Sequence, residues 1–283
     1  MTIKIITDST SDLPNELAIA SSIEVIPLPV RFGSEEFLDG VDISKDDFYT
    51  RLVSEGILPT TSQPSVGDFI ELYKKVADTS EGIVSIHISS KLSGTFNAAI
   101  QAKRELENSE FFSTPIKVID AEHVSMGLGL IAIKAASVAS QGASIGEVEE
   151  VVKSVISKTE FFVLLDTLEY LEKGGRIGKA RSLLGGLLNI KPLIRIENGE
   201  VREMGKERTR RKAIGSLLKM CATFPRIEKR AILHSTSPRE AQSLSEELSN
   251  LYPNAGNPIV AQAGAVIGTY SGPGALGIAL QTA

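Results

Sequence analysis

The sequence predicts an α/β protein made of two α/β domains. Over residues 1–156, short runs rich in isoleucine and valine alternate with stretches of helical spacing, which is typical of a mainly parallel sheet flanked by helices. Over residues 157–283, glycines interrupt shorter apolar runs and an Asn-Gly pair in "IENGEV" indicates a hairpin, so we expect a mixed sheet with helices. A chain of 283 residues is long enough to bury a core in each domain.

The first half is predicted to alternate strands with helices. Extended segments are expected at 3–8, 23–32, 82–88 and 116–121. Two prolines in the second of these segments keep it away from the centre of a sheet. Ser44 is expected to cap a helix whose first turn carries Asp46 and Asp47. Further helices are expected after "STSDLP", from about Ser65, from Thr95, and over 127–142 and 144–158.

The second half is predicted to contain antiparallel strands. "KPLIRI" and "VREMGK" flank the Asn-Gly turn, and "RAILHS" and "PIVAQAGAVIGTYSG" are expected to form further strands. One long helix is expected over Pro238–Leu251, where a proline stands at the helix start.

Composition excludes several classes of function. A net charge of −5 gives no reason to expect a nucleic-acid partner, because nucleic-acid binders usually present a basic surface. The single cysteine, Cys221, excludes an internal disulfide and most thiolate metal sites. No apolar run approaches the roughly 20 residues that span a bilayer. "MTIKIITDSTSD" reaches acidic and hydroxyl side chains too early for a signal peptide. We therefore expect a cytoplasmic protein without a metal or an organic cofactor.

Three glycine-rich stretches resemble nucleotide-binding motifs without meeting their requirements. "GLGLIA" lies several residues past the end of a predicted strand, not at its immediate turn. "GPGALG", at 272–277, is not followed by an acidic ribose partner about 20 residues further on. "GGRIGKARS" has Lys173 where the phosphate loop requires a glycine, five positions before Gly178. A nucleotide-binding module on "GPGALG" is therefore the weakest of three hypotheses.

A serine hydrolase acting on a lipid ester is the second hypothesis. Ser93 follows a predicted strand, and only His123, beside Asp120, lies at a strand end where a general base is useful. His87 lies inside a strand and His234 ends one, which is typical of structural histidines. No G-x-S-x-G elbow occurs, and no His/Asp/Glu cluster has the spacing of metal ligands.

Hydroxyl-rich turns are the remaining candidates. The stretch "ISSKLSGTFNAA", at 88–99, joins a predicted strand to a predicted helix. In open α/β sheets such turns lie at the carboxyl ends of the strands, where ligands bind. A lone hydroxyl there is usually a helix cap or part of a turn. However, "PTTSQPS" around Thr61 also follows an extended segment, so we expect the turns around Thr61 and Ser93 to converge on one crevice. Two converging turns favour a ligand site.

These turns also carry a resemblance to a known family. From about Ile3 to Gly277, the chain resembles the DegV family of bacterial fatty-acid-binding proteins in "TDSTSDLP", "PTTSQPS", "ISSKLSGTFNAA", "DTLEYLEKGGRI", "LNIKPLIRIENGEV" and "GPGALG". The resemblance implies two α/β domains with a long apolar tunnel between them. It implies a non-catalytic carrier for a long-chain fatty acid such as palmitate, stearate or oleate. It also implies a partner, a separate fatty-acid kinase subunit similar to dihydroxyacetone kinase, which phosphorylates the presented carboxylate with ATP.

The resemblance assigns the carboxylate of the fatty acid to particular residues. Thr61, Ser62 and Ser93 match the family's head-group positions, together with the helix start at Gly94 and Thr95. This assignment agrees with the chemistry of a carboxylate, which only accepts hydrogen bonds. Hydroxyl groups and the backbone N–H groups of a helix start supply donors without a neutralising base.

Four further residues are candidates for kinase docking or phosphoryl transfer: Arg176, Arg208, Arg210 and Tyr270. Arg176 in "GGRI" matches an arginine near the tunnel mouth. Arg208 and Arg210 lie in the basic run "GKERTRRK"; such a run is usually a solvated helix start, and the alternative is that it faces an acidic partner. Tyr270 stands in "GTYSGPG", where many family members read G-T-H-x-G-P-G. Tyrosine supplies neither a cation nor a readily transferred proton at neutral pH. We therefore expect this departure to affect kinase coupling more than fatty-acid binding.

Overall fold

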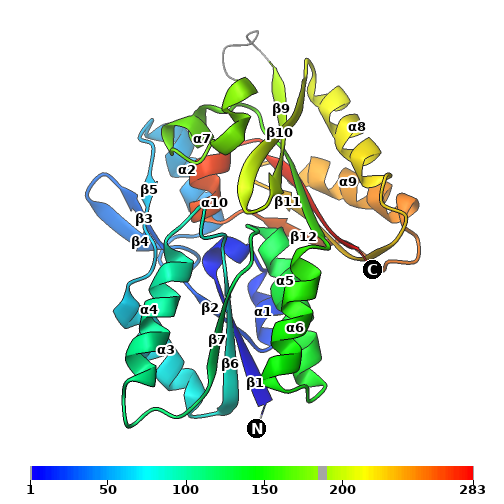
Figure 1. Cartoon of the computed structure of the whole chain (residues 1–283). Coiled ribbons are helices and arrows are strands. Elements are labelled where there is room, and N and C mark those ends of the chain that lie inside the picture. Colours follow the sequence, from blue (N-terminus) through cyan, green and yellow to red (C-terminus); the bar gives the residue numbers. More distant parts are fainter. Residues whose placement is uncertain (1, 184–189, 283) are drawn as a thin grey trace.

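The computed structural model describes residues 2–183 and 190–282. These residues form a parallel sheet, a larger mixed sheet and a small third sheet, with helices on the faces of the two larger sheets (Figure 1). The fold class predicted from the sequence is therefore confirmed. The motif "LNIKPLIRIENGEV" begins at Leu188, and its first two residues lie outside the described residues. Within 2–183 and 190–282, no helix combines the length and the apolar character of a membrane span.

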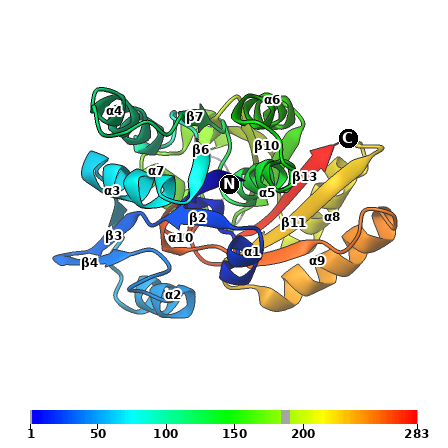
Figure 2. The same ribbon diagram turned by 90° about the horizontal axis from the view of Figure 1, so that it is seen from below.

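The parallel sheet has the strand order β2-β1-β6-β7. Its strands are β1 (Thr2–Asp8), β2 (Ile23–Ile26), β6 (Ser80–His87) and β7 (Ile116–Asp120). Helices on both faces cover this sheet (Figure 2), and they are α1 (Asn15–Ala20), α3 (Val66–Ala77), α4 (Thr95–Glu107), α5 (Met126–Ser140) and α6 (Ile145–Ile156). Because parallel strands all end at the same edge, the turns after β1, β6 and β7 meet there.

Local capping explains where several helices begin. Ser44 accepts a hydrogen bond from the Asp47 amide at 3.1 Å and starts α2 (Lys45–Ser54), as predicted. Ser65 and Asp68 form a capping box at the start of α3, also as predicted. These starts are encoded by neighbouring residues, so the sequence alone places them.

The small sheet has the strand order β4-β3-β5. Its strands are β3 (Pro29–Phe32), β4 (Glu35–Leu38) and β5 (Thr60–Thr61). The segment expected at 23–32 therefore splits between two sheets. β2 is an edge strand as predicted, but the same prediction is wrong for β3, which is the central strand of the small sheet. Pro29 is tolerated because it is the first residue of the strand.

The mixed sheet has the strand order β10-β9-β8-β13-β11-β12. Only β11 and β12 pair in parallel; the other neighbours are antiparallel. The strands are β8 (Thr159–Leu164), β9 (Lys191–Glu197), β10 (Glu200–Glu207), β11 (Ile227–His234), β12 (Ile259–Gln262) and β13 (Leu276–Thr282). The outer face packs against α8 (Arg210–Cys221) and α9 (Pro238–Leu251). α7 (Glu169–Lys173) precedes β9.

The predicted hairpin and the predicted long helix are confirmed. β9 and β10 pair around Asn198 and Gly199, whose φ angles of 51° and 74° are those of a turn that favours Asn-Gly. α9 has the predicted bounds. The sequence patterns did not predict β8 or β13, although these two strands pair with each other at the centre of the sheet.

The strand predicted from "PIVAQAGAVIGTYSG" is only partly correct. β12 covers its first residues, but α10 (Ala265–Ser271) replaces the rest. The cause is remote in sequence: Asp12 accepts a hydrogen bond from the Gly264 amide at 2.7 Å, and Asp39 accepts one from the Ala265 amide at 2.8 Å. Two carboxylates from the first half of the chain thus fix the start of this helix.

Helix α5 lies between the two larger sheets. Its buried residues occur around the helix, and its leucines, isoleucines and alanines belong to one core that includes side chains from both sheets. The first two turns of α5, residues 126–132, are buried on all sides, which is typical of such a central position. The boundary expected at 156/157 falls between α6 and β8, and the division of the chain into two domains there stays a prediction.

Candidate ligand-binding site

A cavity lies where the carboxyl edge of the parallel sheet meets the inner face of the mixed sheet. The volume of this cavity is about 110 Å³. Both predicted hydroxyl turns contribute to its wall, through Thr61 and Ser62 and through Ser93. The expected convergence of these turns on one crevice is therefore present.

Most of the cavity wall is apolar. On β8 and just beyond it, Phe161, Val163 and Leu165 alternate along the chain and so share one face, which lines the cavity. Phe162 and Leu164 point to the opposite face, into the core beneath α8 and α9. The remaining apolar lining residues are Leu28, Ile88, Leu92, Val124, Leu171, Ile194, Ile196, Val201, Leu233, Val266, Ile267 and Ala275.

Polar side chains gather at one end, which we call the mouth cluster: Thr61, Ser62, Gln63, Ser93, Arg176 and Tyr270. The hydroxyl oxygens of Thr61 and Tyr270 are 2.6 Å apart, so β5 and α10 are joined across the mouth. The Arg176 guanidinium lies 5.2 Å from the centre of the Tyr270 ring, within the range of a cation–π contact. Arg176 also donates to the backbone oxygen of Leu92 at 3.2 Å, next to Ser93.

The helix that follows Ser93 begins without a side-chain cap. Gly94 is the N-cap residue of α4 and has no side chain to accept from the first turn. The helix start therefore keeps N–H donors and the positive end of the helix dipole near the mouth cluster. The Ser93 hydroxyl lies 2.9 Å from the hydroxyl of Thr95. Gly94 and Thr95 stand behind Ser93 and do not belong to the cavity lining, so their direct contact with a ligand stays a prediction.

The three predicted arginines occupy different environments. Arg176 belongs to the mouth cluster and is exposed. Arg208 is exposed and lies outside the cavity lining. Arg210 is held inside the protein, because it bonds Glu240 at 2.7 Å, Asp166 at 2.8 Å and the backbone oxygen of Gly274 at 2.7 Å. Arg210 therefore ties α8 and α9 to the "GPG" turn, and its charge is already matched within the chain.

The serine hydrolase hypothesis is not supported by the geometry. His123 turns its Nε2 toward the backbone oxygen of Ile156, at 3.3 Å, and burial lowers its pKa to about 4. Asp120 accepts from the backbone amides of Ser90 and Glu122. Neither side chain is hydrogen-bonded to Ser93, so the three residues do not form a nucleophile–base–acid relay. The described residues also contain no cluster of His, Cys, Asp or Glu that could hold a metal ion.

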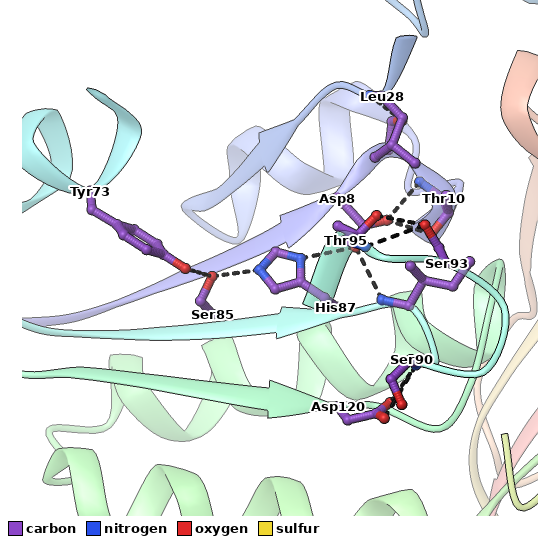
Figure 3. Close-up of polar contacts among 12 residues, drawn as sticks. Asp8, Thr10, Leu28, Tyr73, Ser85, His87, Ser90, Ser93, Thr95 and Asp120 are labelled. Atoms are coloured by element: carbon purple, nitrogen blue, oxygen red, sulfur yellow. Dashed lines mark hydrogen bonds and ion pairs between the residues drawn. The ribbon is translucent and has the colours of Figure 1, made fainter. Parts of the chain in front are cut away.

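A different Ser–His–Asp arrangement does occur, in the core of the parallel sheet (Figure 3). Ser85 Oγ lies 2.6 Å from His87 Nε2, and His87 Nδ1 lies 2.9 Å from Asp8 Oδ2. Tyr73 donates to Ser85 at 3.0 Å. Ser85, His87 and Asp8 are fully buried, so no substrate reaches the serine. The arrangement satisfies buried polar groups, and Asp8 also accepts from the Thr10 amide at 3.1 Å. It thereby fixes Thr10, a cavity-lining residue.

A pair of buried acids lies beside the cavity. Asp12 accepts from the Ser125 hydroxyl at 2.6 Å, and Ser125 lines the cavity. Burial raises the pKa of Asp12 to about 7, although Lys45 and these hydrogen bonds oppose the shift. Burial also raises the pKa of Asp39, against the amide hydrogen bonds from the start of α10. The two acids connect the first half of the chain to the helix that carries Tyr270.

Several lining residues were not predicted individually. Gln63 and Thr10 lie within motifs that were singled out, "PTTSQPS" and "TDSTSDLP", so their hydroxyl or amide side chains were available as a signal. Ser271 also lies within a motif that was singled out, "GTYSGPG", whereas Ser125 carried no comparable signal.

The fold and the cavity define an α/β protein with two large sheets and a mainly apolar binding site that has a polar mouth. The chain belongs to the DegV family: residues 2–283 match the family model described as an uncharacterised protein of the DegV family.

Individual relatives cover nearly the whole chain. Protein DegV of Bacillus subtilis is 34% identical over 286 residues, which is 98% of this chain and 98% of that protein. A DegV domain-containing protein of Caldanaerobacter subterraneus is 34% identical over 278 residues, covering 98% and 97% of the two chains.

Solved structures show the same fold. A DegV family protein from Thermus thermophilus, described by its fatty-acid binding, has a TM-score of 0.92 and 32% identity, with 100% of both chains covered. DegV from Bacillus subtilis, described as a fatty-acid-binding protein, has a TM-score of 0.89 at 32% identity and the same coverage. A stearic-acid-binding protein from Eubacterium ventriosum has a TM-score of 0.89 at 25% identity, covering 99% and 98% of the chains.

Proposed function

We propose that the cavity binds one long-chain fatty acid, with its carboxylate in the mouth cluster and its alkyl tail along the inner face of the mixed sheet. The observation that carries the proposal is a mainly apolar lining along the inner face of the mixed sheet with the mouth cluster at one end; Thr10, Ser125 and Ser271 are the other polar lining residues. The fatty-acid binding described for relatives from Thermus thermophilus and Bacillus subtilis supports it.

The two ends of the ligand have different energetic roles. Burying about fourteen methylenes at roughly 0.8 kcal/mol each gives on the order of 11 kcal/mol before the ordering costs of binding. Each charge-assisted hydrogen bond to the carboxylate contributes about 1.5–3 kcal/mol. The tail therefore supplies most of the affinity. Thr61, Ser62, Ser93 and the start of α4 determine the orientation of the fatty acid, with its carboxylate at the mouth.

Mass spectrometry of protein purified from a bacterial host and then denatured tests the proposal. We expect a co-purified long-chain fatty acid in one-to-one ratio, and uptake of palmitate, stearate or oleate by delipidated protein. Absence of both would refute the proposal. A chromogenic ester serves as the parallel assay, because a non-catalytic carrier binds it without turnover.

Two single substitutions test the head-group assignment. Removing one hydroxyl, in Thr61→Ala or Ser93→Ala, should weaken fatty-acid binding by about tenfold, since one charge-assisted hydrogen bond is lost. Thr50→Ala is the matched control: its hydroxyl bonds the backbone of α2 at Asp46, away from the cavity, so binding should stay unchanged. Equal affinities for all four proteins would place the carboxylate elsewhere.

We further propose that the bound carboxylate is presented to a separate kinase subunit, similar to dihydroxyacetone kinase, which transfers a phosphoryl group from ATP. Two features support this role: the carboxylate end lies at the open mouth, and the exposed Arg176 stands beside it. Arg176 donates to two backbone oxygens, of Leu92 and Gly174, so it is held in place at the rim.

Reconstitution with the kinase subunit of the same organism tests this second step. Acyl-phosphate formation from ATP and a bound fatty acid is expected, and Arg176→Ala should lower its rate at least tenfold while changing fatty-acid affinity little. Arg226→Ala is the control, since Arg226 is exposed and outside the cavity lining. A wild-type protein that binds fatty acid but yields no acyl-phosphate would refute the kinase role alone.

A further inference from the structure

Phe161 lies at the end of the cavity opposite to the mouth cluster. Leu165, Val163 and Phe161 follow one another along the lining face of β8, over about 14 Å at roughly 3.4 Å per residue. Leu165 is the end nearest α7 and Arg176, because the chain enters α7 soon after it. Phe161 is therefore the lining residue of β8 farthest from the mouth, and it is an aromatic side chain among aliphatic ones.

A second, polar cavity lies behind Phe161. Thr159, the next residue on the same face of β8, lines this second cavity and not the first. Val124 lines the first cavity and its neighbour His123 lines the second, while Ile196 contributes to both. The other lining residues include charged side chains, namely Glu122, Lys153, Glu160, Arg195 and Glu197. The two spaces therefore adjoin at Ile196, which lies beside Phe161 on the neighbouring strand β9.

A glycine determines where the Phe161 ring lies. Gly277 on β13 sits beneath the ring: a Cβ atom added there would be 2.9 Å from Cε2 and 3.1 Å from Cζ of Phe161. These approaches are shorter than carbon–carbon contact, so any side chain at 277 lifts the ring off the sheet. The φ angle of Gly277 is not in the left-handed region, so alanine fits the backbone there. The position of the Phe161 ring therefore depends on the absence of a side chain at Gly277. The length of the cavity depends on the position of that ring.

We propose that Phe161 is the end wall of the acyl cavity and sets the longest fatty-acid chain that the protein holds, an inference that rests on the proposed fatty-acid binding. The tail methyl group stops at the Phe161 ring. Beyond the ring, the polar cavity offers no apolar surface that would favour further methylenes.

Substitutions of Phe161 and Gly277 should shift the preferred fatty-acid chain length in opposite directions. Phe161→Ala removes the wall, so the best-bound saturated acid should become longer. Gly277→Ala raises the ring, so the best-bound acid should become shorter. Phe162→Ala is the matched control, because Phe162 is the adjacent residue of the same type, buried on the other face of β8 against Phe224. It should lower thermal stability without changing chain-length preference.

Binding of myristate, palmitate, stearate, arachidate and behenate to delipidated protein measures the preference. In Phe161→Ala, the ratio of the behenate Kd to the palmitate Kd should fall at least about tenfold, since about two further methylenes fit in the space left by the ring and each is worth roughly fourfold in affinity. In Gly277→Ala the same ratio should rise. Should Phe161→Ala not fold, Gly277→Ala decides alone.

Two results would overturn the inference while leaving fatty-acid binding in place. One is an unchanged chain-length profile in both variants. The other is an equal shift in Phe162→Ala, which would indicate general loosening of the sheet. A wild-type protein that binds none of the five acids would instead refute the proposed function itself, and the end wall with it.

Discussion

Tyr270 connects three parts of the mouth cluster. Its hydroxyl is 2.6 Å from that of Thr61, its ring stacks against Arg176, and a Cβ on Gly174 would come within 2.5 Å of the ring. Either hydroxyl can donate in this contact; when Tyr270 donates, the Thr61 hydroxyl keeps its own proton for a ligand.

Replacing Tyr270 by histidine, the residue found there in many family members, tests whether this position acts in fatty-acid binding or in phosphoryl transfer. In Tyr270→His, fatty-acid affinity should change by less than about tenfold, because one neutral hydrogen bond is worth about 0.5–1.5 kcal/mol. The rate of acyl-phosphate formation with the kinase subunit should rise, because an imidazole can carry a proton or a positive charge. The two quantities are measured separately, by ligand titration and by ATP consumption. An unchanged rate would exclude this position from phosphoryl transfer.

Asp12 gives the stability a defined dependence on pH. Its pKa is about 7 in the folded protein, against an ordinary value of 3.8, because burial disfavours the carboxylate. The folded state therefore binds a proton that the unfolded state releases. Protonation of Asp12 therefore contributes to the free energy of unfolding. This contribution is fully present below pH 3.8 and is lost as the pH rises to about 7.

The substitution Asp12→Asn removes this ionisation and retains a side chain that tolerates the left-handed φ of 54° at this position. Between pH 4 and pH 7, the free energy of unfolding should fall less steeply in the variant than in the wild type, as measured by urea denaturation. Asp39 keeps part of the slope, since burial raises its pKa as well. Parallel pH curves for the two proteins would contradict the shift.

At the scale of elements, two glycine–tyrosine contacts hold α7 against α10. Gly174, just after α7, lies under the ring of Tyr270, and Gly272, just after α10, lies under the ring of Tyr170. In Gly174→Ala, the added Cβ would force the Tyr270 ring away from Thr61. We expect weaker fatty-acid binding and a loss of about 1–3 kcal/mol in the free energy of unfolding.

The control for Gly174→Ala is Gly146→Ala in α6. A Cβ at Gly146 meets nothing within 4 Å, so alanine should stabilise the helix by about 0.5–1 kcal/mol and leave binding unaltered. Thermal melts and ligand titrations of both variants test the pair. A Gly174→Ala protein as stable and as tight-binding as the wild type would show that the ring has room to move.

The elements that the sequence predicted correctly are those whose signals are local. The Ser44 and Ser65 caps, the Asn-Gly turn and the start of α9 at Pro238 each lie within a few residues of the structure they specify. α10 could not be predicted in this way, because its start depends on an acceptor that is 252 residues away in the chain.

The same distinction applies to the site. The two turns with hydroxyl side chains, around Thr61 and Ser93, were recognisable in the sequence, and both line the cavity. The apolar wall was not, since Phe161, Val163 and Leu165 lie in the continuous apolar run "FFVLL", whose alternation matters only once β9 and β13 lie beside β8. Arg210 read as part of a basic surface run, and only its contacts with Asp166 and Glu240 identify it as a structural residue.

For the molecule as a whole, α5 decides how it unfolds. The helix packs in one core with side chains of both sheets, so neither sheet can lose its partner without exposing that helix. We expect one cooperative transition in calorimetry, with equal van't Hoff and calorimetric enthalpies. A bound fatty acid should raise Tm without splitting the transition. Two resolved transitions would instead support independently unfolding domains at the 156/157 boundary.

The central place of β13 has a consequence for biosynthesis. This strand, Leu276–Thr282, lies between β8 and β11, so the mixed sheet stays divided until those residues have left the ribosome. Thr61 and Tyr270 are 209 positions apart, which corresponds to about 10–40 s of translation. A nascent chain therefore exposes an apolar half-sheet and has no closed cavity. The cavity is therefore completed only after translation of β13 and α10.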